Sequence, residues 1–177
     1  MSETGIREAA ALGETLAAVE IDLGVATRLV RTQETLELAL GSRETARLVL
    51  PALDEIRFGA FEGGPLDDYR AWAWSHEPQA ECPGGGESRA EAAARIADAL
   101  DVLLAREEDV VLAVSHALPI RYVVDASDGV FPAARIGRVP HAVPFALEAN
   151  ALRLAAETLR AWAATPRFAD ATGEASV

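Results

Sequence analysis

The first third of the chain alternates a helix-like pattern with a strand-like pattern. Residues 2–22 begin with a hydroxyl side chain suited to an N-cap, Ser2 or Thr4, and place hydrophobic side chains broadly on one side at helical spacing: Ile6, Ala10, Leu12, Leu16 and Val19. This spacing predicts an amphipathic helix. A short apolar run at 23–28 then predicts a strand, and residues 31–40 predict a second helix.

The middle of the chain combines a strand-like run with irregular sequence. Residues 47–53 predict a strand, which leads into an irregular segment and then a helical turn at 69–76. Residues 81–88 predict a loop, because Pro83 and three successive glycines break both helix and strand. This loop is too short to separate two hydrophobic cores.

The strongest helix pattern follows this loop at 88–108. Ser88 is the expected N-cap, and Glu91 completes a capping box with it. The remaining predicted elements are a strand at 109–114, a helix after His116, a strand at 142–149 and a helix at 151–165.

Helices that alternate with short buried strands predict an α/β fold with a mainly parallel sheet covered on both faces, which is a three-layer α/β/α sandwich. We find no internal repeat and no domain linker. We therefore expect a single domain over residues 1–165 and a flexible C-terminal tail at 166–177.

Composition narrows the classes of function. The 177 residues carry a net charge of −12, which disfavours binding to nucleic acid or to an anionic membrane, although a few local cations can still bind a small anion. Cys82 is the only cysteine, so an intrachain disulfide is impossible. No apolar run approaches the ~20 residues that cross a bilayer, and the N-terminal residues do not resemble a secretion signal. These features predict a cytoplasmic protein.

Three polar residues stand where ligand sites often form. His116 ends a buried strand, and ligands of open α/β sheets bind beyond the carboxyl ends of strands. Arg31 stands at a helix start, where a cation opposes the helix dipole unless it helps to bind an anion. Glu55 enters a glycine-bearing loop, where a carboxylic acid could protonate a leaving oxygen. Taken singly, each residue is more often structural: a buried histidine, a surface ion pair and a solvated carboxylate.

The order of five segments strengthens the functional interpretation. These are "SETGIREAAALGETLA", "ATRLVRTQET", "LDEIRFGAFEG", "PGGGES" and "VLAVSHALPIR", which together span residues 2–124. They resemble, in the same order, motifs of the histidine phosphatase superfamily, the group of the phosphoglycerate mutases and related phosphatases. The resemblance implies a phosphoglycerate mutase-like fold and hydrolysis of phosphate monoesters, with mutase activity as a variant.

The resemblance also implies a role for each matching residue. Arg31 would clamp the phosphate, Glu55 would be the general acid, and His116 would hold the transferring phosphoryl group. The hydroxyl of Thr27 and the backbone N–H of Ala117 would be further substrate contacts. The implied partner is a small phosphorylated metabolite, and neither a metal nor another cofactor is implied.

One motif of the family is not found in the 177 residues. The nucleophile of the family is a histidine in Arg-His-Gly, on a first strand that precedes the first helix, and this tripeptide does not occur here. His76 and His141 lack the sequence context of a nucleophile. We therefore expect that Met1 is not the natural start and that the first strand is missing.

Without that strand, two strands would each leave a row of backbone groups unpaired, unless the sheet rearranges to close the gap. Each unpaired buried group would lower the stability of the fold by about 1–3 kcal/mol. An open slot of this kind would favour a homodimer.

Two alternatives stay open at this point. The chain could be a catalytically inactive relative that binds a phosphorylated ligand or a partner protein.

The aromatic residues Tyr69, Trp72 and Trp74 stand where the family builds its substrate lid, but a role in the core fits them equally well. A dinucleotide-binding domain is disfavoured, because no predicted strand is followed by Gly-x-Gly-x-x-Gly.

Overall fold

A short parallel sheet lies at the centre of the molecule. The computed structural model describes residues 1–168, and the part of the predicted tail at 169–177 lies outside the described residues. Strand β1 (Leu23–Ala26) lies in the middle, with β2 (Ala46–Val49) on one side and β3 (Val111–Ala113) on the other. Both neighbours run parallel to β1, so all three carboxyl ends lie at the same edge of the sheet.

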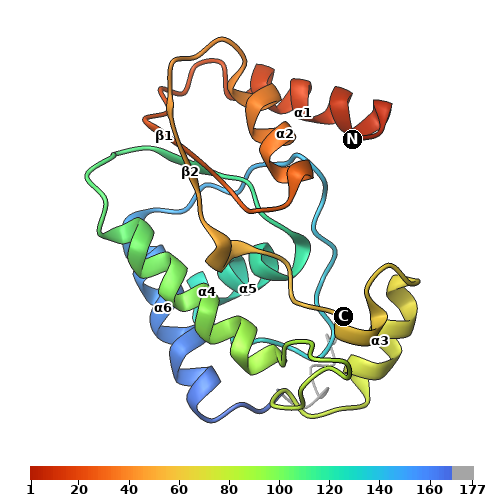
Figure 1. Ribbon diagram of the computed structural model, residues 1–177. Coiled ribbons are helices and arrows are strands. Elements are labelled where there is room, and N and C mark those ends of the chain that lie inside the picture. The colour runs from red at the N-terminus through yellow and green to blue at the C-terminus, as the bar shows by residue number, and fades with distance from the viewer. Residues whose placement is uncertain (169–177) are drawn as a thin grey trace, which may run out of the picture.

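Helices cover both faces of this sheet, as the alternation of patterns predicts (Figure 1). The helices α1 (Glu3–Thr15) and α2 (Val30–Leu40) form one outer layer. The other layer contains α4 (Arg89–Leu104), α5 (Ala117–Ser127) and α6 (Ala149–Ala164). Helix α3 (Leu66–Trp74) lies to one side of these layers, and the two short 3-10 helices are Pro51–Leu53 and Gly59–Phe61. The described residues thus form the expected three-layer α/β/α sandwich.

The central strand β1 is buried along its whole length, and its side chains alternate between the two layers. Leu23 and Val25 pack in one cluster with Ala99 of α4. Gly24 faces α2, where a Cβ atom would lie only 2.9 Å from Leu40 Cδ1. Glycine at this position therefore lets α2 approach the sheet closely.

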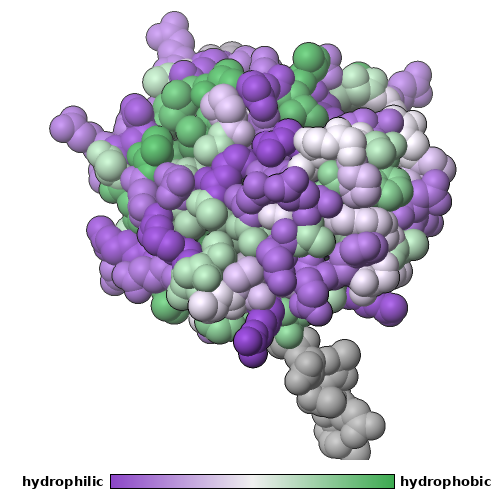
Figure 2. All heavy atoms as spheres, turned by 60° about the horizontal axis from the view of Figure 1, so that its bottom comes forward, coloured by the Kyte–Doolittle hydropathy of each residue, from purple (hydrophilic) through white to green (hydrophobic). Residues whose placement is uncertain are grey.

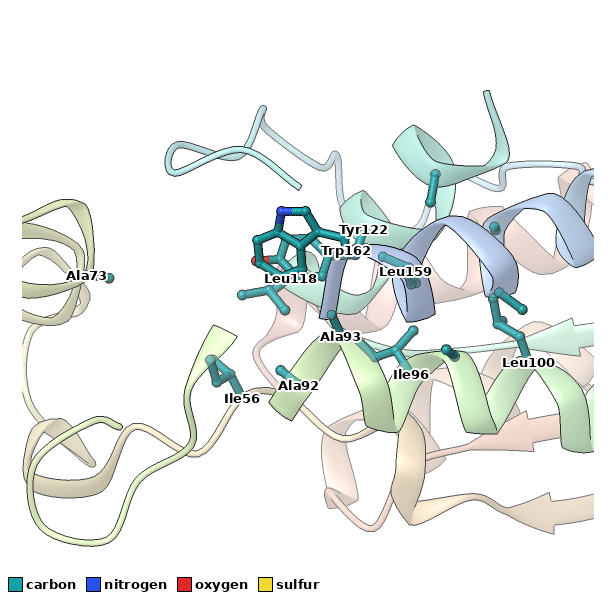
Figure 3. Packing of buried hydrophobic residues seen from close by; sticks show 14 of the residues in the cluster. Ile56, Ala73, Ala92, Ala93, Ile96, Leu100, Leu118, Tyr122, Leu159 and Trp162 are labelled. Carbon is teal, nitrogen blue, oxygen red and sulfur yellow. The ribbon is translucent and has the colours of Figure 1, made fainter. Parts of the chain in front are cut away.

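The largest hydrophobic cluster lies between α4, α5 and α6. Tyr122 and Trp162 meet edge to face at 6.0 Å between ring centroids, and Figure 3 shows them above Ala93 and Ile96 of α4. The indole N–H of Trp162 donates to the backbone carbonyl of Arg167 at 2.7 Å. The chain just after α6 is therefore attached to this core.

The termini of two helices follow local sequence signals to different extents. The capping box at the start of α4 is confirmed, because Glu91 N–H donates to Ser88 Oγ at 3.1 Å and Ser88 N–H donates to Glu91 Oε2 at 2.8 Å. Helix α1 ends at Thr15, earlier than its predicted end at residue 22. The chain leaves the helix because Ile21 packs beneath α2 and Asp22 N–H donates to the Val110 carbonyl on the way into the sheet.

The predicted strand at 142–149 is wrong. These residues form no strand, and Val143 and Phe145 are 51% and 39% exposed. Pro144 lacks the N–H that a ladder needs, and Ala142 has a φ of 51°, which is not a strand conformation. The expected slot between two strands is therefore not formed: among the described residues, β3 pairs with β1 on one side and is an edge strand on the other.

The surface carries hydrophilic and hydrophobic groups in separate small areas, as Figure 2 shows for one face. Within residues 1–168, no helix combines the length and the apolar character needed to span a membrane.

The packing of α6 predicts a position-specific loss of stability. Leu159 is fully buried against the core, whereas Leu154 on the same helix is 42% exposed. We expect Leu159→Ala to lower the free energy of unfolding by about 2–5 kcal/mol, because it removes contacts and leaves a cavity. Leu154→Ala should change it by less than about 0.5 kcal/mol. Urea unfolding of both variants measures the difference, and equal losses would contradict this packing.

Candidate functional site

The site forms where the three strands end. The chain passes from β1 directly into Thr27, from β2 through a 3-10 turn to Glu55, and from β3 to His116 just before α5. Because the strands are parallel, these three segments meet at one edge of the sheet. This edge is where open α/β sheets bind their ligands.

A chain of hydrogen bonds connects the ends of β1 and β3. Arg31 Nη2 donates to His116 Nδ1 at 3.1 Å, so the ring proton is on Nε2, which donates to Thr27 Oγ1 at 2.9 Å. Thr27 Oγ1 in turn donates to Thr32 Oγ1 at 2.8 Å, and Thr32 Oγ1 donates to the Leu29 carbonyl at 2.8 Å. The arginine, which can only donate, and the Leu29 carbonyl, which can only accept, therefore set the direction of every bond.

His116 is held as a neutral imidazole. Burial, with the nearby positive charge of Arg31, lowers the pKa of His116 from 6.5 to about 4. Arg95 adds to this lowering and Asp54 opposes it. Only 6% of the residue is exposed, which explains why the loss of hydration is the leading cause.

Glu55 lies beside Arg31, and the two residues border the same cavity of about 300 Å³. Burial raises the pKa of the Glu55 carboxyl group. The Ile56 N–H, which donates to Glu55 Oε1 at 3.1 Å, partly offsets the effect, as do Arg31 and the Leu118 N–H at the start of α5. A carboxyl group with a raised pKa can carry a proton closer to neutral pH, which is what a general acid needs.

The other two predicted substrate contacts lie at different depths. Thr27 is fully buried, and its hydroxyl is engaged by His116 and Thr32. It therefore orients the histidine in this arrangement. Ala117 is the exposed first residue of α5, where the backbone N–H groups have no partner within the helix. His116, Thr27 and Ala117 do not border the cavity that Arg31 and Glu55 line.

Several polar residues of the site were not predicted from the sequence. Asp54 is only 7% exposed, accepts the Arg28 backbone N–H at 2.9 Å and forms an ion pair with the Arg28 side chain. Glu87 is 2% exposed and pairs with Arg95, which also borders the cavity. The adjacent acids Asp54 and Glu55 were a signal, but nothing in the sequence paired Glu87 with Arg95 at this site.

The remaining histidines and the candidate lid residues lie elsewhere. His76 stacks on Trp72 at 4.6 Å between ring centroids, and the side chain of His141 is 85% exposed. Tyr69 is buried in the main core, which favours the core interpretation for this residue. Trp74 is 44% exposed, with the guanidinium of Arg135 at 4.5 Å above its ring.

The groups around the cavity suit an anion better than a metal ion. Within residues 1–168, no three side chains of His, Cys, Asp or Glu gather so as to hold a metal. Four arginines border the cavity, Arg28, Arg31, Arg57 and Arg95, together with the acidic residues Asp54, Glu55 and Glu62.

The fold and the site define an α/β protein with an arginine-rich ligand site beyond the carboxyl ends of parallel strands. Residues 1–143 match the model of the histidine phosphatase superfamily (branch 1), and the chain belongs to this family. Among curated proteins, none matches the chain.

Solved structures agree with this assignment. The α-ribazole phosphatase of Shigella flexneri is similar with a TM-score of 0.65 and 25% identity, over 73% of this chain and 67% of that one. A mycobacterial glucosyl-3-phosphoglycerate phosphatase, in complex with inorganic phosphate, is similar with a TM-score of 0.60 and 26% identity, over 72% of this chain and 68% of that one. The fold and the family together support phosphatase activity.

The neutral state of His116 predicts a pH dependence of stability. The unfolded chain binds a proton near pH 6.5, whereas the folded chain binds it only near pH 4. This difference between the two pKa values therefore contributes fully to the stability of the folded chain above pH 6.5. The contribution is lost as the pH falls toward 4. We expect His116→Gln to remove this part of the pH slope in urea unfolding. His141→Gln, at an exposed histidine, should keep the slope, and equal slopes in wild type and His116→Gln would contradict the assignment.

Proposed function

We propose that the site serves the hydrolysis of phosphate monoesters, with Arg31, His116 and Glu55 in separate roles. The observation that carries the proposal is the position of Arg31. Its guanidinium bonds to His116 and also borders the cavity, whose wall includes Glu55. Residues that follow β1 and β2 thus line one small polar space, Arg31 connects it to His116 after β3, and family membership supports phosphatase chemistry there.

Arg31 and His116 would stabilise the phosphoryl group. A guanidinium presents several N–H donors in a plane that matches phosphate oxygens, and phosphoryl transfer depends mainly on positioning and on compensation of charge. A bound phosphate dianion would favour the protonated imidazole of His116, because a nearby opposite charge raises a pKa. His116 could then donate from Nδ1 to an equatorial oxygen while Thr27 keeps the ring in place.

Glu55 would be the proton donor for the leaving group. When the bond between phosphorus and the ester oxygen breaks, that oxygen takes up negative charge, which a proton from Glu55 removes as the alcohol leaves. The raised pKa of the Glu55 carboxyl supports this role, since the group must still be protonated when substrate binds.

The nucleophile has no assignment within these residues. The resemblance implies a phosphohistidine intermediate on a histidine in Arg-His-Gly, and the 177 residues do not contain that tripeptide. Both ring nitrogens of His116 are engaged in hydrogen bonds, which fits a stabilising role better than a nucleophilic one.

A second candidate function follows from the same observation. A relative without the nucleophile could bind a small phosphorylated ligand, or a phosphorylated partner protein, without turnover. Arg31 and the amides at the start of α5 would be sufficient for this binding, because helix N-termini and arginines both attract phosphate.

Phosphate binding tests what both candidates share. We expect inorganic phosphate to bind the purified protein in isothermal titration calorimetry and Arg31→Gln to weaken this binding about tenfold or more, because it removes a charged donor. Arg106→Gln is the matched control, since Arg106 pairs with Glu108 away from the site. Equal weakening by both variants, or no binding to the wild type, would contradict the proposed site.

Turnover of p-nitrophenyl phosphate separates the two candidates. Hydrolysis that is lost in Arg31→Ala and in His116→Ala would rule out the binding-only function. Stabilisation by phosphate in thermal unfolding, with no hydrolysis by the wild type, would instead favour the binding-only function.

A further inference from the structure

The hydroxyl groups of Thr27 and Thr32 use all their hydrogen-bonding positions. Thr27 Oγ1 accepts from His116 Nε2 at 2.9 Å and from the Leu29 N–H at 3.3 Å. Its own proton goes to Thr32 Oγ1, which lies 2.8 Å away. Thr32 Oγ1 also accepts the Thr27 N–H at 3.2 Å and donates to the Leu29 carbonyl at 2.8 Å. Each hydroxyl thus donates once and accepts twice, which is its full capacity.

Only two atoms can accept the proton of the Thr27 hydroxyl. The Leu29 N–H is itself a donor, so the described contacts leave Thr32 Oγ1 and His116 Nε2 as acceptors. If Thr32 accepts, the neutral ring of His116 carries its proton on Nε2, and Nδ1 keeps the lone pair to which Arg31 donates. If Nε2 accepts instead, the ring proton is on Nδ1, and the Arg31 guanidinium must turn away because it can only donate.

Arg31 by itself holds this choice only weakly. The residue is exposed, so its guanidinium can exchange the bond to His116 for bonds to water. Thr27 and Thr32 are buried, at 0% and 3% exposed. A buried hydroxyl proton without an acceptor is costly, because no water replaces the lost partner. The acceptor that Thr32 provides therefore contributes more to the choice of tautomer than the guanidinium does.

The charged groups around the ring do not make this choice. Arg31, Arg95 and Asp54 all act on the imidazole of His116, but none of them forms a hydrogen bond with Nε2 among the described contacts. They change how readily the ring takes up a second proton. The two threonines determine which nitrogen already holds the first.

We propose that Thr32 is a positioning residue of the phosphate site: through Thr27, it keeps the ring proton of His116 on Nε2 and leaves the Nδ1 lone pair facing the guanidinium and the anion. The inference rests on the proposed function for the identity of that anion. It adds a residue that acts on His116 without contacting the ligand. It also specifies the proton that the ring takes up from solvent when the anion binds: this proton goes to Nδ1, and Nε2 keeps its own.

Nitrogen NMR of the histidine rings tests the role of Thr32. The chain has three histidines, and His116→Gln identifies the signals of His116 by their loss. At pH 7 we expect the wild type to show Nε2 protonated and Nδ1 unprotonated. Thr32→Val replaces the hydroxyl by a methyl group and makes His116 the remaining acceptor. It should raise the ratio of the Nδ1–H form to the Nε2–H form about tenfold or more, as the loss of one buried hydrogen bond allows.

Two further variants control this measurement. Thr32→Ser keeps an acceptor and should restore the wild-type signals. Thr35→Val is the matched control, since the Thr35 hydroxyl lies on the same helix and donates to the Arg31 carbonyl at 2.8 Å without contacting the ring. If Thr32→Val does not fold, Thr32→Ala makes the same test with a smaller side chain. The same tautomer in the wild type and in the folded Thr32 variant, or an equal change in Thr35→Val, would overturn the inference.

Addition of inorganic phosphate separates this inference from the proposed function. We expect phosphate to move the Nδ1 signal of wild-type His116 toward the protonated position while Nε2 keeps its proton. If the tautomer depends on Thr32 as expected but phosphate leaves both signals unchanged, the proposed phosphate site fails and the positioning role of Thr32 stands. Loss of the Nε2 proton when phosphate binds would instead overturn the positioning role.

Discussion

The site depends on the hydrogen bonds of one buried imidazole. His116 accepts from Arg31 and donates to Thr27, so it joins the residue after β3 to α2 and to the residue after β1. These bonds impose a single tautomer and a single ring orientation, because arginine can only donate and because the Thr27 hydroxyl donates its own hydrogen bond to Thr32. Two strand ends far apart in the sequence are thereby fixed relative to one another, and the arginine is held at the wall of the cavity.

The electrostatics of the site follow from this arrangement. Burial and the guanidinium of Arg31 both lower the pKa of the His116 imidazole, whereas burial raises the pKa of the Glu55 carboxyl group against the opposing effect of Arg31. Ion pairs to Asp54 and Glu87 engage Arg28, Arg95 and, at longer distance, Arg57, whereas Arg31 forms no ion pair among the described residues. An acidic protein can in this way present a locally positive site, and electrostatic stabilisation of a phosphoryl group needs little more than such fixed donors.

Local sequence signals predicted much of the fold and part of the site. The capping box of Ser88 and Glu91 gave the start of α4 within one residue, because a cap depends on neighbouring residues alone. The strand at 142–149 was predicted from its apolar residues, but a strand needs a partner, and Pro144 removes one of its donors. Arg31, Glu55 and His116 could be proposed from position and resemblance. The sequence does not show that Arg95 and Arg57 both pair with Glu87, because these ion pairs depend on how distant loops meet.

The central claim is that Arg31 and His116 together form the phosphate site beyond the strand ends. A crystal structure of the protein with bound inorganic phosphate or vanadate tests it most directly. The account predicts an ion within hydrogen-bond distance of the Arg31 guanidinium, near His116 and the first amides of α5, with the Glu55 carboxyl group facing it. An ion bound only by Arg28 or Arg57, with the bond between Arg31 and His116 unchanged and no anion beside it, would contradict the account.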